Sequence, residues 1–371
     1  MAEQIINNNE TNQQLYEHYN FIIDLNQSTI RIDKFLYDTL PNVTRNKLQE
    51  AIKNGFIKVN EKKIKSSYKI KANDKIIVSL PKPPRNKDIE PENLPLNIVF
   101  EDDDILIINK EAGMVVHPAH QNWNGTLVNA LMYHFKNLPE MKNNEGRPGL
   151  VHRIDKETSG LLVIAKTEIA MNNLSKQFYD HTIQRKYQAL IWGTPNKEKG
   201  TINTNLGRSF KDRRIIDAFA DNTFGKKAIT HYKVIEQYHY ISLIECELET
   251  GRTHQIRAHM KHIGHPIFND KTYGGDRVVK GNKFTNYKKF VENNFKLMPR
   301  QGLHAKSLGF IHPTTNQKVI FESELPEDFL GVIDRWKNYN KATNTGTDND
   351  VSGTLWKRTD LGTGGTDVLF Q

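Results

Sequence analysis

Residues 150–166, LVHRIDKETSGLLVIAK, place an arginine and a carboxylate two positions apart between two apolar segments. This pair, Arg153 and Asp155, permits two interpretations. An aspartate in a polar turn often caps a helix or pairs locally, so the stretch could be an ordinary surface loop. A carboxylate held between two buried segments could instead act as a nucleophile or a general base.

Cofactor-binding motifs are missing from the sequence. There is no GxGxxG after an apolar strand, no GxxxxGK[ST] and no GxSxG. Their absence argues against nucleotide cofactors, phosphoryl transfer and an esterase-type serine. We therefore expect the protein to need no cofactor.

Four histidines crowd together in one segment and suggest a metal site as an alternative. They are His254, His259, His262 and His265. Their spacing is not that of HExxH, and no carboxylate or thiol stands at the spacing that a metal ligand needs. The sequence therefore predicts no metal site.

The composition is that of a globular protein. Of 371 residues, 37% are hydrophobic and 26% are charged, which suits a soluble chain with room for two domains. No apolar run approaches the roughly 18 residues that cross a bilayer, and the acidic start lacks the features of a signal peptide. A single cysteine, Cys246, excludes a disulfide framework. We expect a cytoplasmic protein without a membrane partner.

Positive charge is concentrated in one block. Residues 1–27 contain four acids and no Lys or Arg, whereas residues 28–87 contain 15 Lys or Arg against 5 Asp or Glu, a net charge of +10. A local basic block is typical of a surface that binds a polyanion. The alternative is a solvated lysine-rich face in a protein from a genome biased toward Lys and Asn.

The first part of the chain is expected to hold a small domain. Residues 1–28 are predicted to be disordered. Residues 29–80 show two short helical patterns, with Thr44 as a plausible N-cap of the second, followed by strand-like segments. Residues 81–95 contain five prolines, which predicts a semi-rigid linker.

The rest of the chain is expected to form a larger domain. In residues 96–340 strand-like segments run in clusters and adjacent ones resemble hairpins, so we predict an α+β fold with a mainly antiparallel mixed sheet flanked by helices. Residues 341–371 are expected to be a flexible tail. Their ending, DVLFQ, resembles the remnant of a viral-protease site used to remove tags.

Residues 31–81 resemble an S4-type RNA-binding domain, a family that places a helix pair and a loop against the RNA backbone. Within this likeness the cations of the second helical pattern take the positions that face phosphates. They are Arg45, Lys47 and Lys53.

Four later segments, taken in order, closely resemble the RluA/RluD family of pseudouridine synthases. They are INKEAGMVVHP, GLVHRIDKETSGLLVIAK, QRKYQALIWG and ELETGRTHQIRAHMKHIGHPIFNDKTYG. Any one of them would be a weak signal, but HRIDKETSG with GRTHQIR downstream repeats the two signature motifs of the family nearly letter for letter. One departure is Glu111, which stands where the family pattern has a proline.

The resemblance implies a role for each matching residue. Asp155 matches the essential catalytic carboxylate, and Arg257 matches the arginine that pairs with it. Tyr187 matches the tyrosine that stacks on the target uracil and is a candidate proton carrier. Arg153 matches the arginine that replaces the flipped base in the RNA stack, and Ile256 matches the apolar residue beside the base.

The same motifs place three more residues among those expected to contact RNA, namely His152, Arg252 and His254. The chemistry suits these residue types. A buried carboxylate is costly unless it is paired, and a guanidinium favours its ionised form. A planar guanidinium can stack between bases, and an aromatic ring offers a face to an extruded base.

The implied activity is the isomerisation of specific uridines to pseudouridine in RNA, which needs no hydride, phosphate or metal. The implied partner is ribosomal RNA, most similar to the large-subunit branch of the family, and nothing in the sequence demands more than a monomer. The alternatives are a non-catalytic RNA-binding or ribosome-assembly factor that keeps the fold, and the same chemistry on tRNA. Whether Asp155 attacks C1′ or takes a proton at C2′ stays open.

Overall fold

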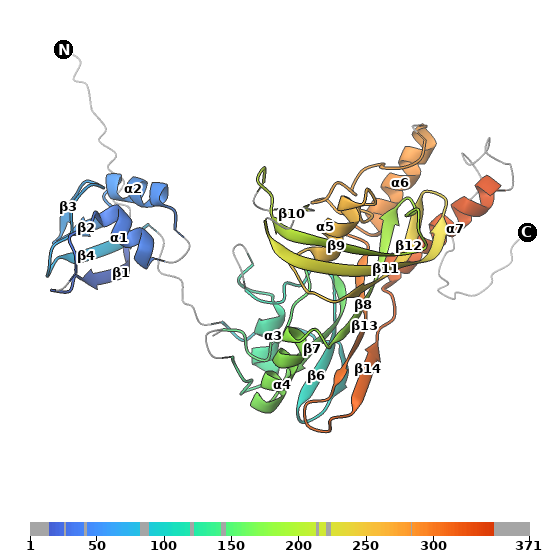
Figure 1. Cartoon of the computed structure of the whole chain (residues 1–371), viewed down its shortest axis with the longest axis horizontal. Helices are drawn as coiled ribbons and strands as arrows, with labels where there is room; N and C mark the ends of the chain where they lie inside the picture. The colour runs from blue at the N-terminus through green and yellow to red at the C-terminus, as the bar shows by residue number, and fades with distance from the viewer. Residues whose placement is uncertain are drawn as a thin grey trace, which may run out of the picture. The chain divides into compact units, whose positions relative to one another are not determined.

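The computed structural model describes residues 15–25, 27–40, 43–81, 89–118, 122–141, 146–212, 215–219, 224–282 and 284–344. The chain divides into two compact units, residues 1–88 and residues 89–371 (Figure 1). Most of the predicted tail, from residue 345 onward, lies outside the described residues.

Unit 1 is a small sheet with two helices. Its strands are β1 (Tyr16–Ile22), β2 (Ile57–Val59), β3 (Lys62–Lys63) and β4 (Lys75–Leu80), and its helices are α1 (Ile32–Thr39) and α2 (Arg45–Lys53). The antiparallel strands lie in the order β1-β4-β2-β3. The predicted helix pair and strands are confirmed. Thr44 caps α2 as expected, since its side chain accepts a hydrogen bond from the amide of Lys47.

The prediction that residues 1–28 are disordered is wrong for β1. This strand pairs with β4 over most of its length, and Phe21 and Ile23 pack on the core of the unit. The physical reason is the sheet edge, because β4 would otherwise leave a row of backbone groups unpaired on its second side. The amide-rich composition of the segment concealed this pairing. Residues 1–14 lie outside the described part of the chain.

Unit 2 is built on a ten-stranded sheet in the order β10-β9-β11-β12-β8-β13-β7-β6-β5, with β14 paired to β13. The strands are β5 (Ile98–Glu101), β6 (Ile105–Lys110), β7 (Ser159–Ala165), β8 (Gln184–Trp192), β9 (Lys199–Arg208), β10 (Ile216–Phe219), β11 (Lys226–Tyr238), β12 (Ile241–Leu248), β13 (Leu303–Ile311) and β14 (Lys318–Glu322). Every pairing is antiparallel except that of β13 with β7. The predicted α+β class with a mainly antiparallel sheet is confirmed.

Several helices accompany this sheet (Figure 1). They are α3 (Leu127–His134), α4 (Glu168–Tyr179), α5 (Gln255–His262), α6 (Thr285–Leu297) and α7 (Glu327–Asn344). The described helices include none long and apolar enough to cross a membrane. Helix α7 continues to residue 344, so the prediction of a flexible tail is wrong for residues 341–344.

Strand β7 is buried on both faces of the sheet. Along β7, Leu162 and Ile164 pack with α3 and α5, whereas Leu161 and Val163 pack with α4. Gly160 marks the contact of β7 with β13. A Cβ atom there would lie 2.3 Å from the carbonyl oxygen of Ala305, so only glycine permits this approach.

The predicted linker is shorter than residues 81–95. Residues 82–88 lie outside the described part of the chain, but residues 89–95 run against α3. Asn129 donates a hydrogen bond to the carbonyl of Glu90 at 2.7 Å, and the amide of Gly125 donates to the carboxylate of Glu92 at 3.0 Å. These residues therefore belong to unit 2.

Candidate active site

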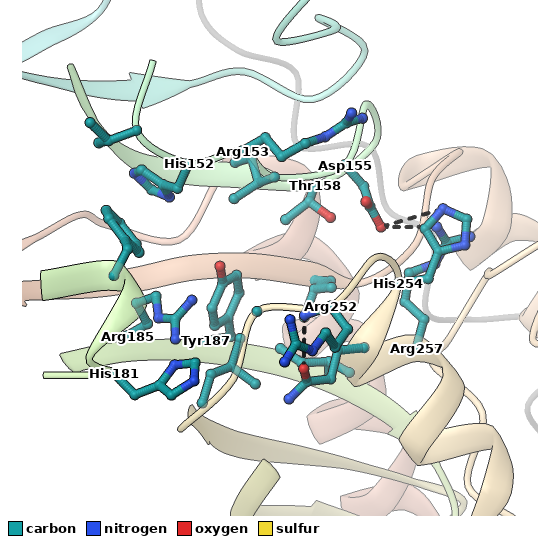
Figure 2. A pocket seen from close by; sticks show the side chains of 18 of the residues that line it. His152, Arg153, Asp155, Thr158, His181, Arg185, Tyr187, Arg252, His254 and Arg257 are labelled. Carbon is teal, nitrogen blue, oxygen red and sulfur yellow. Dashed lines mark hydrogen bonds and ion pairs between the residues drawn. The ribbon is translucent and has the colours of Figure 1, made fainter. Parts of the chain in front are cut away.

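A pocket of about 620 Å³ opens beside the central strands of unit 2 (Figure 2). Its walls come from the loop before β7, the end of α4, strand β8, and the loop between β12 and α5. The volume is typical of a site for a small molecule or a single nucleotide. Of the residues predicted for the site from sequence, the pocket is lined by His152, Arg153, Asp155, Tyr187, Arg252, His254, Ile256 and Arg257.

Asp155 and Arg257 form an ion pair in this pocket, as the sequence predicts. Nη1 of Arg257 donates to Oδ2 of Asp155 at 3.0 Å. The Asp155 side chain remains partly open to the pocket, whereas the Arg257 side chain is buried. The carboxylate is thus held in a fixed direction while one side stays accessible (Figure 2).

Asp270 completes this arrangement and was missed from sequence. Its buried carboxylate receives Nε of Arg257 at 2.6 Å and Nη2 at 2.9 Å, a two-pronged contact. Burial opposes the charge of Arg257, but the hydrogen bonds and charge of Asp270, followed by Asp155, outweigh it and raise the pKa of Arg257. The arginine therefore stays charged and presents its remaining nitrogen to Asp155.

Helix α5 begins at a strained residue that its loop holds in place. His254, just before the helix, has a φ of 54°, a conformation uncommon for residues other than glycine. Gln255 secures the loop, because its side chain accepts from the amide of Arg252 at 2.9 Å and donates to the carbonyl of Ile229 at 2.9 Å. Gln255 is a second positioning residue that sequence reasoning missed.

His254 faces Asp155 without forming a firm contact. Its Nε2 lies 3.9 Å from Oδ2 of Asp155, and its Nδ1 lies 3.1 Å from the hydroxyl of Tyr273. Burial lowers the pKa of His254 more than the charge of Asp155 raises it. The imidazole is therefore neutral near pH 7.

Tyr187 stands on β8 with its hydroxyl directed into the pocket (Figure 2). The ring is 9% exposed and packs in the main core cluster, which also contains Ile256. Burial raises the pKa of Tyr187, with a smaller contribution in the same direction from Asp155. The hydroxyl therefore keeps its proton, and the side chain lines the pocket where a flat group could rest against it.

Arg153 and His152, neighbours in sequence, differ in their surroundings. Arg153 is exposed, whereas the ring of His152 stacks on Phe178 with 4.6 Å between centroids. Nε2 of His152 accepts the amide of Val163 at 3.0 Å. Burial, followed by the charge of Arg185, lowers the pKa of His152 to about 3. This neutral ring packs within the fold and also lines the pocket, and its expected contact with RNA stays a prediction.

Lys110 explains how the INKEAGMVVHP segment supports the site. Its buried Nζ donates to the carbonyls of Glu111 at 2.5 Å, Met114 at 2.9 Å and Lys156 at 3.1 Å. Lys156 follows Asp155, so this ammonium group ties the segment to the loop of the carboxylate. Burial lowers the pKa of Lys110 to about 7. Glu111, the departure from the family pattern, contributes a backbone carbonyl to this contact.

The remaining predicted contacts lie in unit 1. Lys47 and Lys53 are exposed on α2. Arg45 instead donates to the buried carboxylate of Asp33 at 3.1 Å, which also receives Arg31 and Gln49. Arg45 is still about half exposed, so it can present part of its guanidinium to an anion.

The four histidines considered as metal ligands do not converge. His259 bonds to the hydroxyls of Thr230 and Thr204 in the core, and His265 contacts the carbonyl of Trp192. The described residues contain no group of three or more His, Cys, Asp or Glu side chains that could hold a metal ion.

Comparison with known proteins identifies both units. Residues 104–262 match the model of the RNA pseudouridylate synthase family, and residues 30–76 match that of the S4 domain. An uncharacterized RNA pseudouridine synthase of Chlorobaculum parvum is 45% identical over 83% of this chain and 94% of its own length.

Relatives with a named target include two proteins called ribosomal large subunit pseudouridine synthase D. The one from Zymomonas mobilis is 42% identical over 80% of this chain and 91% of its own length. The one from Neisseria meningitidis serogroup B is 41% identical over 82% of this chain and 78% of its own length.

Proposed function

Because the chain belongs to the RNA pseudouridylate synthase family and carries an S4 domain, we propose that it converts specific uridines of large-subunit ribosomal RNA to pseudouridine in the cytoplasm. Its class of activity, isomerisation of uridine in RNA, follows from family membership. The choice of RNA is supported by the relatives named for the large ribosomal subunit.

The observation that supports the mechanism is a pair of linked ion pairs: Arg257 pairs with Asp270 and also with Asp155. Pseudouridine formation breaks the bond between N1 and C1′, turns the base, and joins C5 to C1′. A carboxylate beside the ribose is needed, and it can attack C1′ or take a proton at C2′. Asp155 is the carboxylate in the pocket that is both held by an arginine and partly open to a substrate.

The target base has to leave its stack to reach this carboxylate. Flipping a base costs a few kcal/mol, less in a loop than in a duplex. Tyr187 offers the base a surface inside the pocket, where stacking contributes roughly 1–3 kcal/mol. Exposed Arg153 precedes Asp155 by two residues and can fill the gap left in the RNA.

The role of Arg153 can be tested by changing the structure of the RNA. Arg153→Ala should lose more turnover on a folded RNA than on a short flexible strand carrying the same uridine, because only the folded RNA has a gap to fill. Single-turnover rates on the two RNAs measure this. Equal losses on both RNAs would argue against the wedge role.

The choice of RNA is tested with unmodified transcripts. Large-subunit rRNA, small-subunit rRNA and a tRNA mixture are incubated separately with the full-length protein, and pseudouridine is measured by chromatography of the nucleosides. We expect pseudouridine only in the large-subunit transcript. Product in the tRNA alone would assign the same chemistry to another RNA, and product in none would favour a binding factor that keeps the fold.

A further inference from the structure

Arg185 is a buried cation that the roles proposed above do not use. It is 7% exposed and lines the pocket. Nη2 donates to the carbonyl of Glu249 at 3.2 Å, and the guanidinium lies 5.5 Å from the centroid of the Phe178 ring. Its Nε atom is buried and, among the described residues, has no hydrogen-bond partner. A buried charge without an acidic partner destabilises a fold.

Glu249, whose backbone carbonyl Arg185 contacts, does not neutralise this cation with its side chain. The carboxylate of Glu249 bonds to His231 at 2.7 Å instead and is exposed. The titratable groups that interact with Arg185 are Tyr187 and the neutral ring of His152. Within the described part of the chain, Arg185 forms no ion pair with any carboxylate, so its donors can serve something that enters the pocket.

The position of Arg185 relative to Asp155 indicates what that partner is. Arg185 and Tyr187 are two residues apart on β8, so they project from the same face of the strand. Figure 2 shows Tyr187 between Arg185 on one side and Asp155 with Arg257 on the other. Both Arg185 and Asp155 act electrostatically on Tyr187. A base resting on Tyr187 thus has the carboxylate at one end and the guanidinium at the other.

We propose that Arg185 recognises the target base by donating hydrogen bonds to the carbonyl of uracil that lies opposite the glycosidic bond. This inference rests on the proposed role of Asp155, which marks the ribose end of the pocket. In uridine the atom across the ring from N1 is C4, and its oxygen points away from C1′. An arginine has five donors and no acceptor. Cytosine would present an amino group at this place, which a guanidinium cannot bind.

The same contact serves the product. Turning the detached base about the axis through N3 and C6 exchanges N1 with C5 and C4 with C2. The C2 carbonyl then occupies the place that the C4 carbonyl has left. When the N1–C1′ bond breaks, the electron pair stays on the base and its negative charge spreads to both carbonyl oxygens. That pair returns to C1′ through C5, while C5 loses its proton and N1 gains one. Arg185 faces a carbonyl throughout.

The test combines an altered residue with an altered base. Wild type, Arg185→Met and Arg185→Leu are compared on an RNA carrying uridine or 4-thiouridine at the target, with single-turnover formation of the C-nucleoside as the readout. Sulfur is a weak acceptor, so the wild type should slow about ten- to hundredfold on 4-thiouridine, the usual effect of losing a hydrogen bond to a charged group. The Arg185→Met variant should convert uridine more slowly than the wild type by a similar factor. Replacing uridine by 4-thiouridine should not slow this variant further.

A phosphate contact is distinguished by salt dependence. A lost phosphate contact flattens the slope of log K against log salt by about 0.7–0.9. Arg185→Met should leave this slope unchanged, whereas Arg252→Met, which alters a half-buried arginine of the same pocket, should flatten it and keep the full sensitivity to 4-thiouridine. Arg185→Met should also match or exceed the wild type in melting temperature, because it removes an unpaired buried charge.

Two results would overturn the inference. One is a full 4-thiouridine effect retained by Arg185→Met, or by Arg185→Leu if the methionine variant does not fold. The other is a flattened salt slope for Arg185→Met together with equal losses of rate on uridine and on 4-thiouridine. This result would make Arg185 a phosphate contact. Failure of the wild type to convert the uridine RNA would instead refute the proposed function, and with it this inference.

Discussion

The guanidinium of Arg257 is the most constrained group in the pocket at the scale of single residues. Two of its nitrogens are held by Asp270, and a third holds Asp155. A lysine could not form this fork, because its ammonium is a single point of charge. The direction of the Asp155 carboxylate thus depends on Asp270, which contacts Arg257 and not Asp155 itself.

Asp270→Asn should therefore lower turnover while RNA binding stays within about twofold. The amide cannot receive both arginine nitrogens, and breaking such a buried pair costs up to about 3–5 kcal/mol in the free energy of unfolding. Single-turnover assays measure the loss of turnover, and denaturant unfolding measures the loss in the free energy of unfolding.

A matched control exists in the same unit. Asp328 accepts two hydrogen bonds from Arg300 in the same two-pronged arrangement, from Nε at 2.7 Å and from Nη2 at 2.8 Å. Asp328→Asn should also lose stability, by less than Asp270→Asn because the Asp328 side chain is 27% exposed, yet keep most of its turnover. If both variants lost turnover in proportion to stability, Asp270 would be a structural residue only.

At the scale of elements, sequence patterns predicted the local structure well. The helix pair of unit 1 follows from apolar spacing and, for α2, from the N-cap Thr44, and local spacing is what those patterns report. Strand β1 was missed because its stability comes from pairing with β4, more than fifty residues later along the chain.

The residues of the site divide in the same way, into those that a local pattern predicts and those that depend on long-range packing. Arg153, Asp155 and Arg257 lie in motifs that can be read from sequence, but Asp270 and Arg185 cannot be assigned in that way. Asp270 meets Arg257 only after the chain turns beyond α5. Arg185 reads as one more strand arginine until its burial and missing partner are seen. Long-range packing, which no local pattern encodes, decides both.

Unit 1 has its own buried charge, which predicts a pH dependence. Asp33 on α1 is fully buried and receives Arg31, Arg45 and Gln49. Burial alone would raise its pKa, but the hydrogen bonds from Arg31 and Gln49, with the charge of Arg31, lower it to about 2.

The stabilisation from Asp33 should be complete above the ordinary aspartate pKa of roughly 3.9 and disappear as the pH falls through about 2. Asp33→Asn should thus accelerate hydrogen exchange in peptides from α1 and α2 at pH 6, and this difference should vanish near pH 2. Asp38→Asn, at an exposed position on the same helix, is the control. Equal exchange in wild type and Asp33→Asn at pH 6 would contradict the assignment.

At the scale of the whole molecule, binding and chemistry are assigned to different units. Each unit has its own hydrophobic core. The basic block, residues 28–87 with a net charge of +10, falls in unit 1, whereas the pocket is lined entirely by residues of unit 2. We therefore expect unit 1 to supply affinity that depends on salt.

Removal of residues 1–88 should weaken binding to ribosomal RNA and flatten its salt dependence. Each phosphate contact contributes about 0.7–0.9 to the slope, so the double variant Lys47→Gln, Lys53→Gln in the full chain should remove up to two such contributions. Filter binding across a salt series measures both. A truncated protein with an unchanged slope would show that unit 1 is not the anchor.

The proposed role of Asp155 in the isomerisation is tested by the release of hydrogen from C5 of the target uridine. Large-subunit rRNA is transcribed with uridine tritiated at C5, and tritium release is followed with full-length wild type and Asp155→Asn, after checking that both bind the RNA equally. C5 loses its hydrogen only when the new carbon–carbon bond forms. We predict release by the wild type and none above background by Asp155→Asn. Release by the variant at a rate near that of the wild type would contradict the account.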